Sequence, residues 1–319
     1  MNVLVTSISK KVPLLKEVKR ACLQVDENSL LFGADTDKHA IGRYFVDYFW
    51  LMPPINQLEI EELIDYCMSN KITAIIPTRD GELPYFSRYR VHLEKHGIVV
   101  MVSGVQQIDH CLDKLSFYIV SHDIGFPVIS TASKIEELTE WDSFVIKERF
   151  GAGSKEVGIN LNKEDAVKHA TILKDPIFQP FIEGEEYSVD IYIEKQGQVK
   201  GVIARKRELV VHGESQITTT VTFPEIEEMC SRFVEALKLY GHVVMQVIVD
   251  KQRNFHIIEC NPRFGGASTL SLAAGLDSFT WFLTEVKYGH VDHLPFERSS
   301  VEIKQIRYPQ DKIIEIHDK

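Results

Sequence analysis

The first hundred residues alternate short apolar runs with segments in which apolar residues recur at helical spacing. The apolar runs are 2–6, 29–33, 74–76 and 97–102, and the amphipathic segments are 13–24, 58–68 and 83–95. This alternation predicts a mostly parallel sheet with helices on both faces. Open sheets of this kind bind ligands at the carboxyl ends of their strands. Asp80 and Glu82 follow such an end, so we expect them to face a ligand; capping of the next helix is an equal alternative for Asp80.

From about residue 104 the pattern changes to helix-like segments mixed with long alternating runs. The helix-like segments are 114–123, 133–140, 163–173 and 225–239, and the antiparallel runs are 186–195, 198–208 and 214–222. The mixture predicts two α+β lobes with a ligand between them. Residues 268–274 and 279–288 predict two helices that end the fold. The charged tail 311–319 contains an apolar step at 313–314 that could form a last strand.

A hairpin near the end of this region carries the first candidate site. Apolar residues flank a polar turn at 251–254, so Gln246 returns beside Glu259 and Asn261. Along a strand Glu259 and Asn261 point one way and Cys260 the other. Carboxylate and amide oxygens suit Mg²⁺ or Mn²⁺. Arg263 could hold an anion next to the metal. The alternative is a solvated surface hairpin.

A second motif lies about a hundred residues earlier. A strand at 144–149 carries Lys147 and runs into the glycine-containing loop 150–158, after which 157–161 reads as another strand. Glycines let backbone N–H groups turn toward a phosphate, so the loop is a candidate flap over a triphosphate. It matches neither the Walker loop nor the dinucleotide fingerprint. When the loop 150–158 is considered by itself, an ordinary hairpin turn is the better explanation.

The third motif, 176–190, passes from an apolar strand through a short acidic turn into another strand. Such a segment can offer backbone groups to adenine and a carboxylate to ribose. A solvated acidic turn is the alternative.

The three motifs and their order resemble the ATP-grasp superfamily, in particular the ATP-grasp unit of the carbamoyl phosphate synthetase large subunit. Residues 2–6, 32–35 and 75–84 resemble the pre-ATP-grasp domain of that group, and 111–114 resembles the entry into its ATP-binding unit.

The resemblance implies a Rossmann-like pre-ATP-grasp domain at 1–104, ATP-grasp lobe A at 105–182, and lobe B with a C-terminal tail at 183–319. The residues that it implies for ATP binding are Lys114, Lys147, Gly151, Gly153, Ser154, Gln179, Phe181, Ile182, Glu186 and His212. Arg205 is a further candidate beside the phosphates. Two cations, Mg²⁺ or Mn²⁺, would be held by Gln246, Glu259 and Asn261.

Lys147 and Arg263 would be the catalytic residues, with Arg263 stabilising the transferred phosphoryl group. The chain departs from the family pattern at Gln179, where many members have Glu, and at Gln246, where many have Asp or Glu. Both changes keep an oxygen but remove a charge, so we expect weaker or altered cation binding.

The activity implied is ATP-dependent activation of a carboxylate as an acyl phosphate, followed by attack of an amine. At 319 residues the chain is too short for a whole carbamoyl phosphate synthetase, so we expect a stand-alone carboxylate–amine ligase. Two alternatives remain open: a kinase that phosphorylates a small molecule, and a non-catalytic ATP-binding module. A Rossmann dehydrogenase is disfavoured because residues 6–9 lack the glycine fingerprint.

Composition bears on the partners, the cysteine chemistry and the membrane association that the chain could have. A net charge of −10 disfavours a nucleic-acid partner. The five scattered cysteines form no zinc or disulfide pattern and suit a reducing cytoplasm. No apolar run approaches the roughly 20 residues that cross a bilayer. We expect Lys10 and Lys11 to be solvated, and leave the basic cluster 205–207 free to meet an anionic substrate. A homodimer is one option for the assembly.

Overall fold

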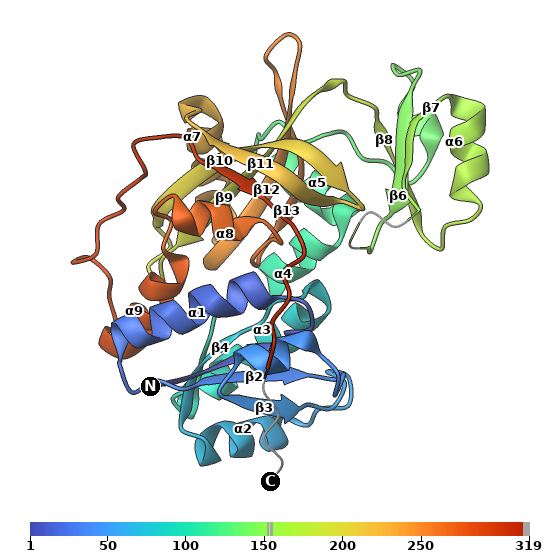
Figure 1. The fold of residues 1–319 in the computed structure, drawn as a ribbon. Helices are drawn as coiled ribbons and strands as arrows, with labels where there is room; N and C mark the ends of the chain where they lie inside the picture. The colour runs from blue at the N-terminus through green and yellow to red at the C-terminus, as the bar shows by residue number, and fades with distance from the viewer. Residues whose placement is uncertain (152, 154–155, 315–319) are drawn as a thin grey trace.

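Three β-sheets organise the computed structural model, which describes all residues except 152, 154–155 and 315–319. Figure 1 shows the parallel sheet of the N-terminal region at one end, a large antiparallel sheet above it and a small sheet to one side. This mixed α/β architecture confirms the fold class expected from the sequence. The domain limits at 104 and 182 stay a prediction.

The N-terminal sheet is parallel throughout, in the order β3-β2-β1-β4-β5. Its strands are β1 (Asn2–Thr6), β2 (Leu31–Asp35), β3 (Tyr48–Leu51), β4 (Ile72–Ile76) and β5 (Val99–Val100). Its neighbouring helices are α1 (Val12–Val25), α2 (Ile60–Ser69), α3 (Leu83–Lys95) and α4 (Val105–Leu112), with short 3₁₀ turns at Ile41–Phe45 and Asp80–Glu82. The strand order reverses between β1 and β4, which places a ligand crevice at the ends of these two strands.

The smallest sheet has the order β7-β6-β8 and is antiparallel. It comprises β6 (Phe144–Glu148), β7 (Gly158–Leu161) and β8 (Pro176–Pro180); α5 (Lys114–Asp123) precedes it and α6 (Lys163–Ala170) follows β7. The expectation of a helix at 133–140 is wrong. Only a 3₁₀ turn, Ile135–Glu137, forms there, because one tight turn already buries both Ile135 and Leu138 in the small core.

The large sheet has the order β13-β12-β9-β10-β11-β14 and is antiparallel. Its strands are β9 (Gly184–Ile193), β10 (Val199–Val211), β11 (Glu214–Val221), β12 (Gly241–Asp250), β13 (Phe255–Asn261) and β14 (Lys304–Ile306). The helices of this region are α7 (Pro224–Ala236), α8 (Ser268–Ala273) and α9 (Ser278–Tyr288). The last strand is therefore β14, and 311–314 forms none.

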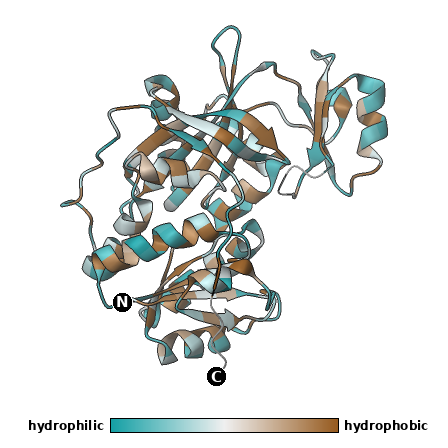
Figure 2. Cartoon of the chain, viewed as in Figure 1, coloured by the Kyte–Doolittle hydropathy of each residue, from teal (hydrophilic) through white to brown (hydrophobic). Residues whose placement is uncertain are grey.

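Helices α1 and α9 join the large sheet to the N-terminal region. Figure 2 shows hydrophobic and hydrophilic bands alternating along α1, as expected of a helix that buries one face. Leu15 of α1 and Phe282 of α9 share one core cluster with Tyr192 of β9. No helix in the described part of the chain is long and apolar enough to cross a membrane.

The turn between α8 and α9 generates a stability prediction. Gly275 has φ +106°, and a Cβ there would lie 2.0 Å from the backbone oxygen of Glu297. Gly289, at the end of α9, has φ +86° but open space around its Cβ position. Gly289→Ala should cost about 1–2 kcal/mol through left-handed strain alone. Gly275→Ala should cost about 1–3 kcal/mol more, because the backbone must move.

Denaturant unfolding of both variants measures this difference. Equal losses of unfolding free energy would contradict the close approach of the two backbone segments.

Candidate active site

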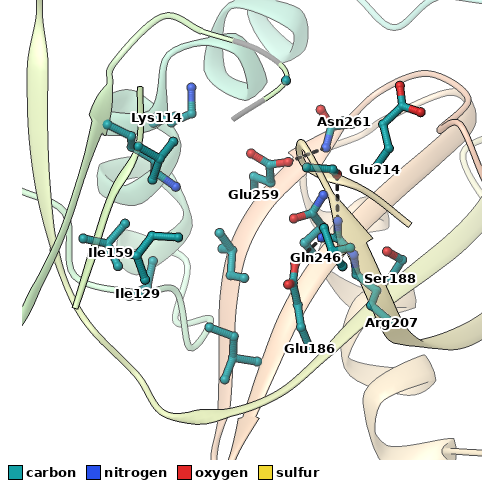
Figure 3. Close-up of a pocket in the computed structure, with 18 of the residues that line it drawn as sticks. Lys114, Ile129, Ile159, Glu186, Ser188, Arg207, Glu214, Gln246, Glu259 and Asn261 are labelled. Atoms are coloured by element: carbon teal, nitrogen blue, oxygen red, sulfur yellow. Dashed lines mark hydrogen bonds and ion pairs between the residues drawn. The ribbon is translucent and has the colours of Figure 1, made fainter. Parts of the chain in front are cut away.

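A cavity of about 1170 Å³ opens between the large and the small sheet. The cavity collects almost every site residue expected from the sequence: Lys114, Lys147, Gly151, Gly153, Gln179, Phe181, Ile182, Glu186, His212, Gln246, Glu259, Asn261 and Arg263. Ser154 lies outside the described residues. In Figure 3, Lys114 stands on one side of the cavity and Glu259, Asn261 and Gln246 on the other.

The β12–β13 hairpin builds the second of these walls. Gln246 pairs directly with Glu259, and the Asn261 amide nitrogen donates to Glu259 Oε1 at 2.9 Å. Cys260 points into the core on the opposite face, where it is 1% exposed. The expected hairpin and its alternation are therefore confirmed. A bulge beside Gln246 breaks the regular register next to this trio.

The hairpin trio offers one carboxylate and two amide oxygens. No cluster of three His, Cys, Asp or Glu side chains suited to a metal occurs within the described residues. Hard oxygen ligands fit Mg²⁺, which is commonly held by one or two carboxylates together with water and substrate phosphates. The donor set therefore fits a magnesium ion shared with a ligand better than a cage made by the protein alone.

Two lysines stand on the wall made by the small sheet and α5. Burial lowers the pKa of Lys147 to about 8, against the opposing influence of the Glu259 charge. Lys114 donates to the backbone oxygen of Gly151 at 2.8 Å, and burial also lowers its pKa. Neither lysine forms a salt bridge with a residue that the structure describes. This wall therefore supplies cationic groups that are not paired with acidic side chains.

Hydrogen bonds hold the residues that line the cavity at the end of β8. Gln179 is 2% exposed, and its side-chain nitrogen donates to Thr131 Oγ1 at 2.8 Å. The Phe181 N–H donates to the Ser143 oxygen at 2.8 Å, so only the carbonyl of Phe181 is available to a ligand. Its neighbour Ile182 also lines the cavity.

Arg207 was missed as a specific site residue. It forms an ion pair with Glu186 and donates to Ser215 Oγ at 3.0 Å and to the Gly213 oxygen at 2.7 Å. Burial raises the pKa of Glu186, while Arg207 acts against this shift. The basic cluster 205–207 was the only signal in the sequence. Its exposed neighbour His212 stands at the tip of the same hairpin, with φ +50°.

Arg263 connects the cavity to the N-terminal sheet. It donates to both carboxylate oxygens of Asp80, at 2.7 and 2.5 Å. Asp80 forms no cap, so the capping alternative is wrong. Glu82 accepts hydrogen bonds from Thr6 Oγ1 at 3.0 Å and Ser7 Oγ at 2.7 Å and is buried.

The expectation that Lys11 is solvated is also wrong. Lys11 Nζ donates to the backbone oxygen of Thr78, in the crevice between β1 and β4. Burial, together with the nearby charge of Arg263, lowers its pKa to about 8. The sequence could not distinguish Lys11 from its exposed neighbour Lys10.

Two family models match the chain: "PylC-like, N-terminal domain" over residues 3–101, and "ATP-grasp in the biosynthetic pathway with Ter operon" over residues 173–309. The carbamoyl phosphate synthase large chain of Pyrococcus furiosus is 20% identical over 222 residues. Residues 173–309 therefore match an ATP-grasp family. The alignment with the Pyrococcus furiosus protein covers 62% of this chain and 21% of that relative, so the chain spans about a fifth of the relative's length.

Solved structures share the ATP-grasp fold. The biotin carboxylase domain of 2-oxoglutarate carboxylase from Hydrogenobacter thermophilus, in complex with MgADP and bicarbonate, has a TM-score of 0.75 at 18% identity. The match covers 95% of this chain and 73% of that one. N5-carboxyaminoimidazole synthetase from Staphylococcus aureus, complexed with ADP, has a TM-score of 0.73 at 15% identity and covers 91% and 78%.

The Arg263–Asp80 pair generates a second prediction. Both side chains are less than 20% exposed, whereas the Lys195–Glu94 pair, which joins the turn after β9 to α3, is 50% and 44% exposed. Asp80→Asn should lower the unfolding free energy by about 2 kcal/mol, because it removes a charged acceptor of two hydrogen bonds. Glu94→Gln should cost less than about 1 kcal/mol.

Chemical unfolding of the two variants measures both losses of unfolding free energy. A loss in Asp80→Asn no larger than in Glu94→Gln would show that the Arg263 contact adds nothing to stability.

Proposed function

We propose that the protein is an ATP-dependent ligase that joins a carboxylate to an amine through an acyl phosphate. The observation that carries this proposal is the arrangement of one cavity. Lys114 and Lys147 stand on one wall, the oxygen ligands of the β12–β13 hairpin stand on the other, and Arg263 lies beside them. A polyanion and a divalent cation fit between such walls. ATP-grasp relatives with bound MgADP or ADP support the same assignment.

In this proposal adenine lies against Gln179, where the Phe181 carbonyl and the Ile182 N–H can meet its edge. Glu186 would turn from Arg207 toward the ribose. Lys114, Lys147 and the amides of Gly151 and Gly153 would contact the phosphates. Gln246, Glu259 and Asn261 would hold Mg²⁺ or Mn²⁺, two ions per site, and the cations would neutralise charge on the β- and γ-phosphates. A cytoplasmic location and a homodimer stay predictions.

The proposed reaction has two steps. A carboxylate oxygen attacks the γ-phosphorus, the bond from that phosphorus to the β–γ bridging oxygen breaks, and ADP leaves. The amine nitrogen then attacks the acyl carbon, the carbon–oxygen bond to phosphate breaks, and the amine proton passes to solvent. No protein nucleophile is needed, so the protein acts by positioning and by charge stabilisation.

Exclusion of water would strengthen this stabilisation. Two unit charges 4 Å apart attract by about 1 kcal/mol in bulk water and by about 4 kcal/mol at an effective dielectric constant of 20. Asp80 fixes the guanidinium of Arg263, whose Nη2 also lies 3.3 Å from Asn261 Oδ1. Arg263 is therefore oriented before substrate arrives, as an electrostatic stabiliser must be.

Trapping with hydroxylamine tests the activity. With MgATP, hydroxylamine and pooled carboxylic acids, we expect ADP and a hydroxamate, since hydroxylamine intercepts an acyl phosphate whatever the natural amine is. A stable phosphorylated product without hydroxamate would indicate a kinase instead. ATP binding without any turnover under these conditions would indicate a non-catalytic module.

Glu259→Gln should lower hydroxamate formation roughly 10²- to 10³-fold, because it removes the one carboxylate of the proposed metal trio. Glu208→Gln is the matched control: Glu208 is a glutamate of β10 that pairs with Lys304 on the exposed surface. Its rate should stay near that of the unsubstituted protein. A Glu259→Gln variant as active as the control would remove the metal site from the proposal.

The lowered pKa of Lys147 predicts how ATP affinity depends on pH. Lysine binds phosphate only when protonated, and the Lys147 pKa is about 8. The dissociation constant for MgATP should therefore rise above pH 8, by up to about tenfold per pH unit for one proton. In Lys147→Arg the guanidinium stays charged, so this contribution to the rise of the dissociation constant should be lost. Calorimetry from pH 7 to 9.5 measures both profiles, and parallel profiles would contradict the role of Lys147.

A further inference from the structure

Arg205 carries a buried hydrogen-bond donor without an acceptor. The residue is 2% exposed and forms part of the cavity wall. Its hydrogen bonds to side chains all come from Nε, which donates to Asp190 Oδ2 at 2.6 Å and to Ser271 Oγ at 3.1 Å. Nη1 finds no acceptor among the described residues. Buried donors are nearly always satisfied in folded proteins, so this nitrogen points to a ligand.

Asp190 fixes the orientation of this guanidinium. Asp190 also accepts from Ser271 Oγ at 2.9 Å and lies 3.1 Å from Nε2 of the buried His242. Burial disfavours the Asp190 carboxylate, but Arg205 and His242 together hold the pKa of Asp190 below its ordinary value. The carboxylate thus holds Arg205 by Nε and leaves its terminal nitrogens for another acceptor.

The register of the large sheet places Arg205 relative to the proposed metal trio. Glu259 pairs with Gln246, Gln246 with Ser188, and Ser188 with Arg205. Directly paired residues present their side chains on the same face of a sheet. Two strand spacings separate Gln246 from Arg205, which is about 10 Å. Arg205 therefore faces the same cavity as the trio, two strands away from Gln246.

Small polar side chains and glycines form part of the cavity lining. Ser188 and Ser215 are among them, and Figure 3 shows Ser188 on the same side of the cavity as Gln246 and Arg207. Gly265 and Gly266 also border the cavity here; a Cβ on Gly266 would lie 3.2 Å from Arg307 Nη1. Lys114 and Lys147 belong to the opposite wall. The triphosphate therefore has its own cations, and Arg205 is left for a different anion.

We propose that Arg205 binds a second anionic group of the acid substrate, so that the acid is a dicarboxylate. One carboxylate lies near Glu259 and Arg263 and is phosphorylated. The other stays ionised and accepts hydrogen bonds from the terminal nitrogens of Arg205, with Ser188 between the two ends. This inference rests on the proposed ligase function and specifies its acid.

Matched acids test the inference. Each dicarboxylate of a chain-length series is compared with its own monoamide, which keeps the length but loses the distal charge. The readout is hydroxamate formed per enzyme, as kcat/KM. We expect one chain length at which the dicarboxylate is preferred roughly 10- to 100-fold, the value of hydrogen bonds to a charged group. Hydroxamate formation without any preference for a dicarboxylate would overturn the inference while leaving the ligase function in place.

Arg205→Lys tests the residue itself. Lysine keeps a cation beside Asp190, so the fold is retained, but it lacks the guanidinium donors. The preference should fall to near unity, mainly through a higher KM for the dicarboxylate. Lys206→Gln is the matched control, because Lys206 pairs with the exposed Glu185 on the other face. A preference that survives in Arg205→Lys would overturn the assignment.

A direct binding measurement separates failure of the inference from failure of the proposed function. Calorimetry with a non-hydrolysable ATP analogue and Mg²⁺ compares the same acid pairs without requiring turnover. Selective dicarboxylate binding that is lost in Arg205→Lys supports the site even if no hydroxamate forms. No selective binding at any chain length would refute it.

Discussion

The register of the large antiparallel sheet is the constraint on which the site depends. Glu259, Gln246, Ser188 and Arg205 stand in one row across four strands because each pairs directly with the next. A slip of one residue between any two strands would turn one member into the core. The core on the opposite face opposes such a slip, since Met245, Cys260 and Val189 are packed there. Burial of apolar neighbours thus fixes the positions of polar groups that contribute little to stability themselves.

The N-terminal sheet completes the site from outside this row. Its crevice between β1 and β4 faces Arg263, where Asp80 supplies both carboxylate oxygens to the guanidinium. The shared core of α1 and α9 holds the two regions together over a larger area than this single pair. Packing therefore sets the approach of the two regions, and the ion pair sets the orientation of Arg263 within it.

The sequence predicted what local pattern controls. Alternation placed Glu259 and Asn261 on one face, and the polar turn brought Gln246 beside them. Contacts between distant segments left no such pattern. Asp80 and Arg263 are 183 positions apart, and Lys11 resembles its solvated neighbour until β4 is placed beside β1. Edge strand β3 was missed because two of its four residues are exposed, the other two are half-exposed, and the strand shows no clean alternation.

The charges of the cavity divide into two kinds. On the large sheet and its following loop, Arg205, Arg207 and Arg263 each pair with an acid of the protein, namely Asp190, Glu186 and Asp80. Such pairs carry little net charge but hold donors in fixed directions. The lysines opposite them form no salt bridge within the described chain, and burial lowers the pKa of Lys147. The lysines therefore supply net charge for a polyanion, whereas the arginines supply direction, which a reaction at one phosphorus atom requires.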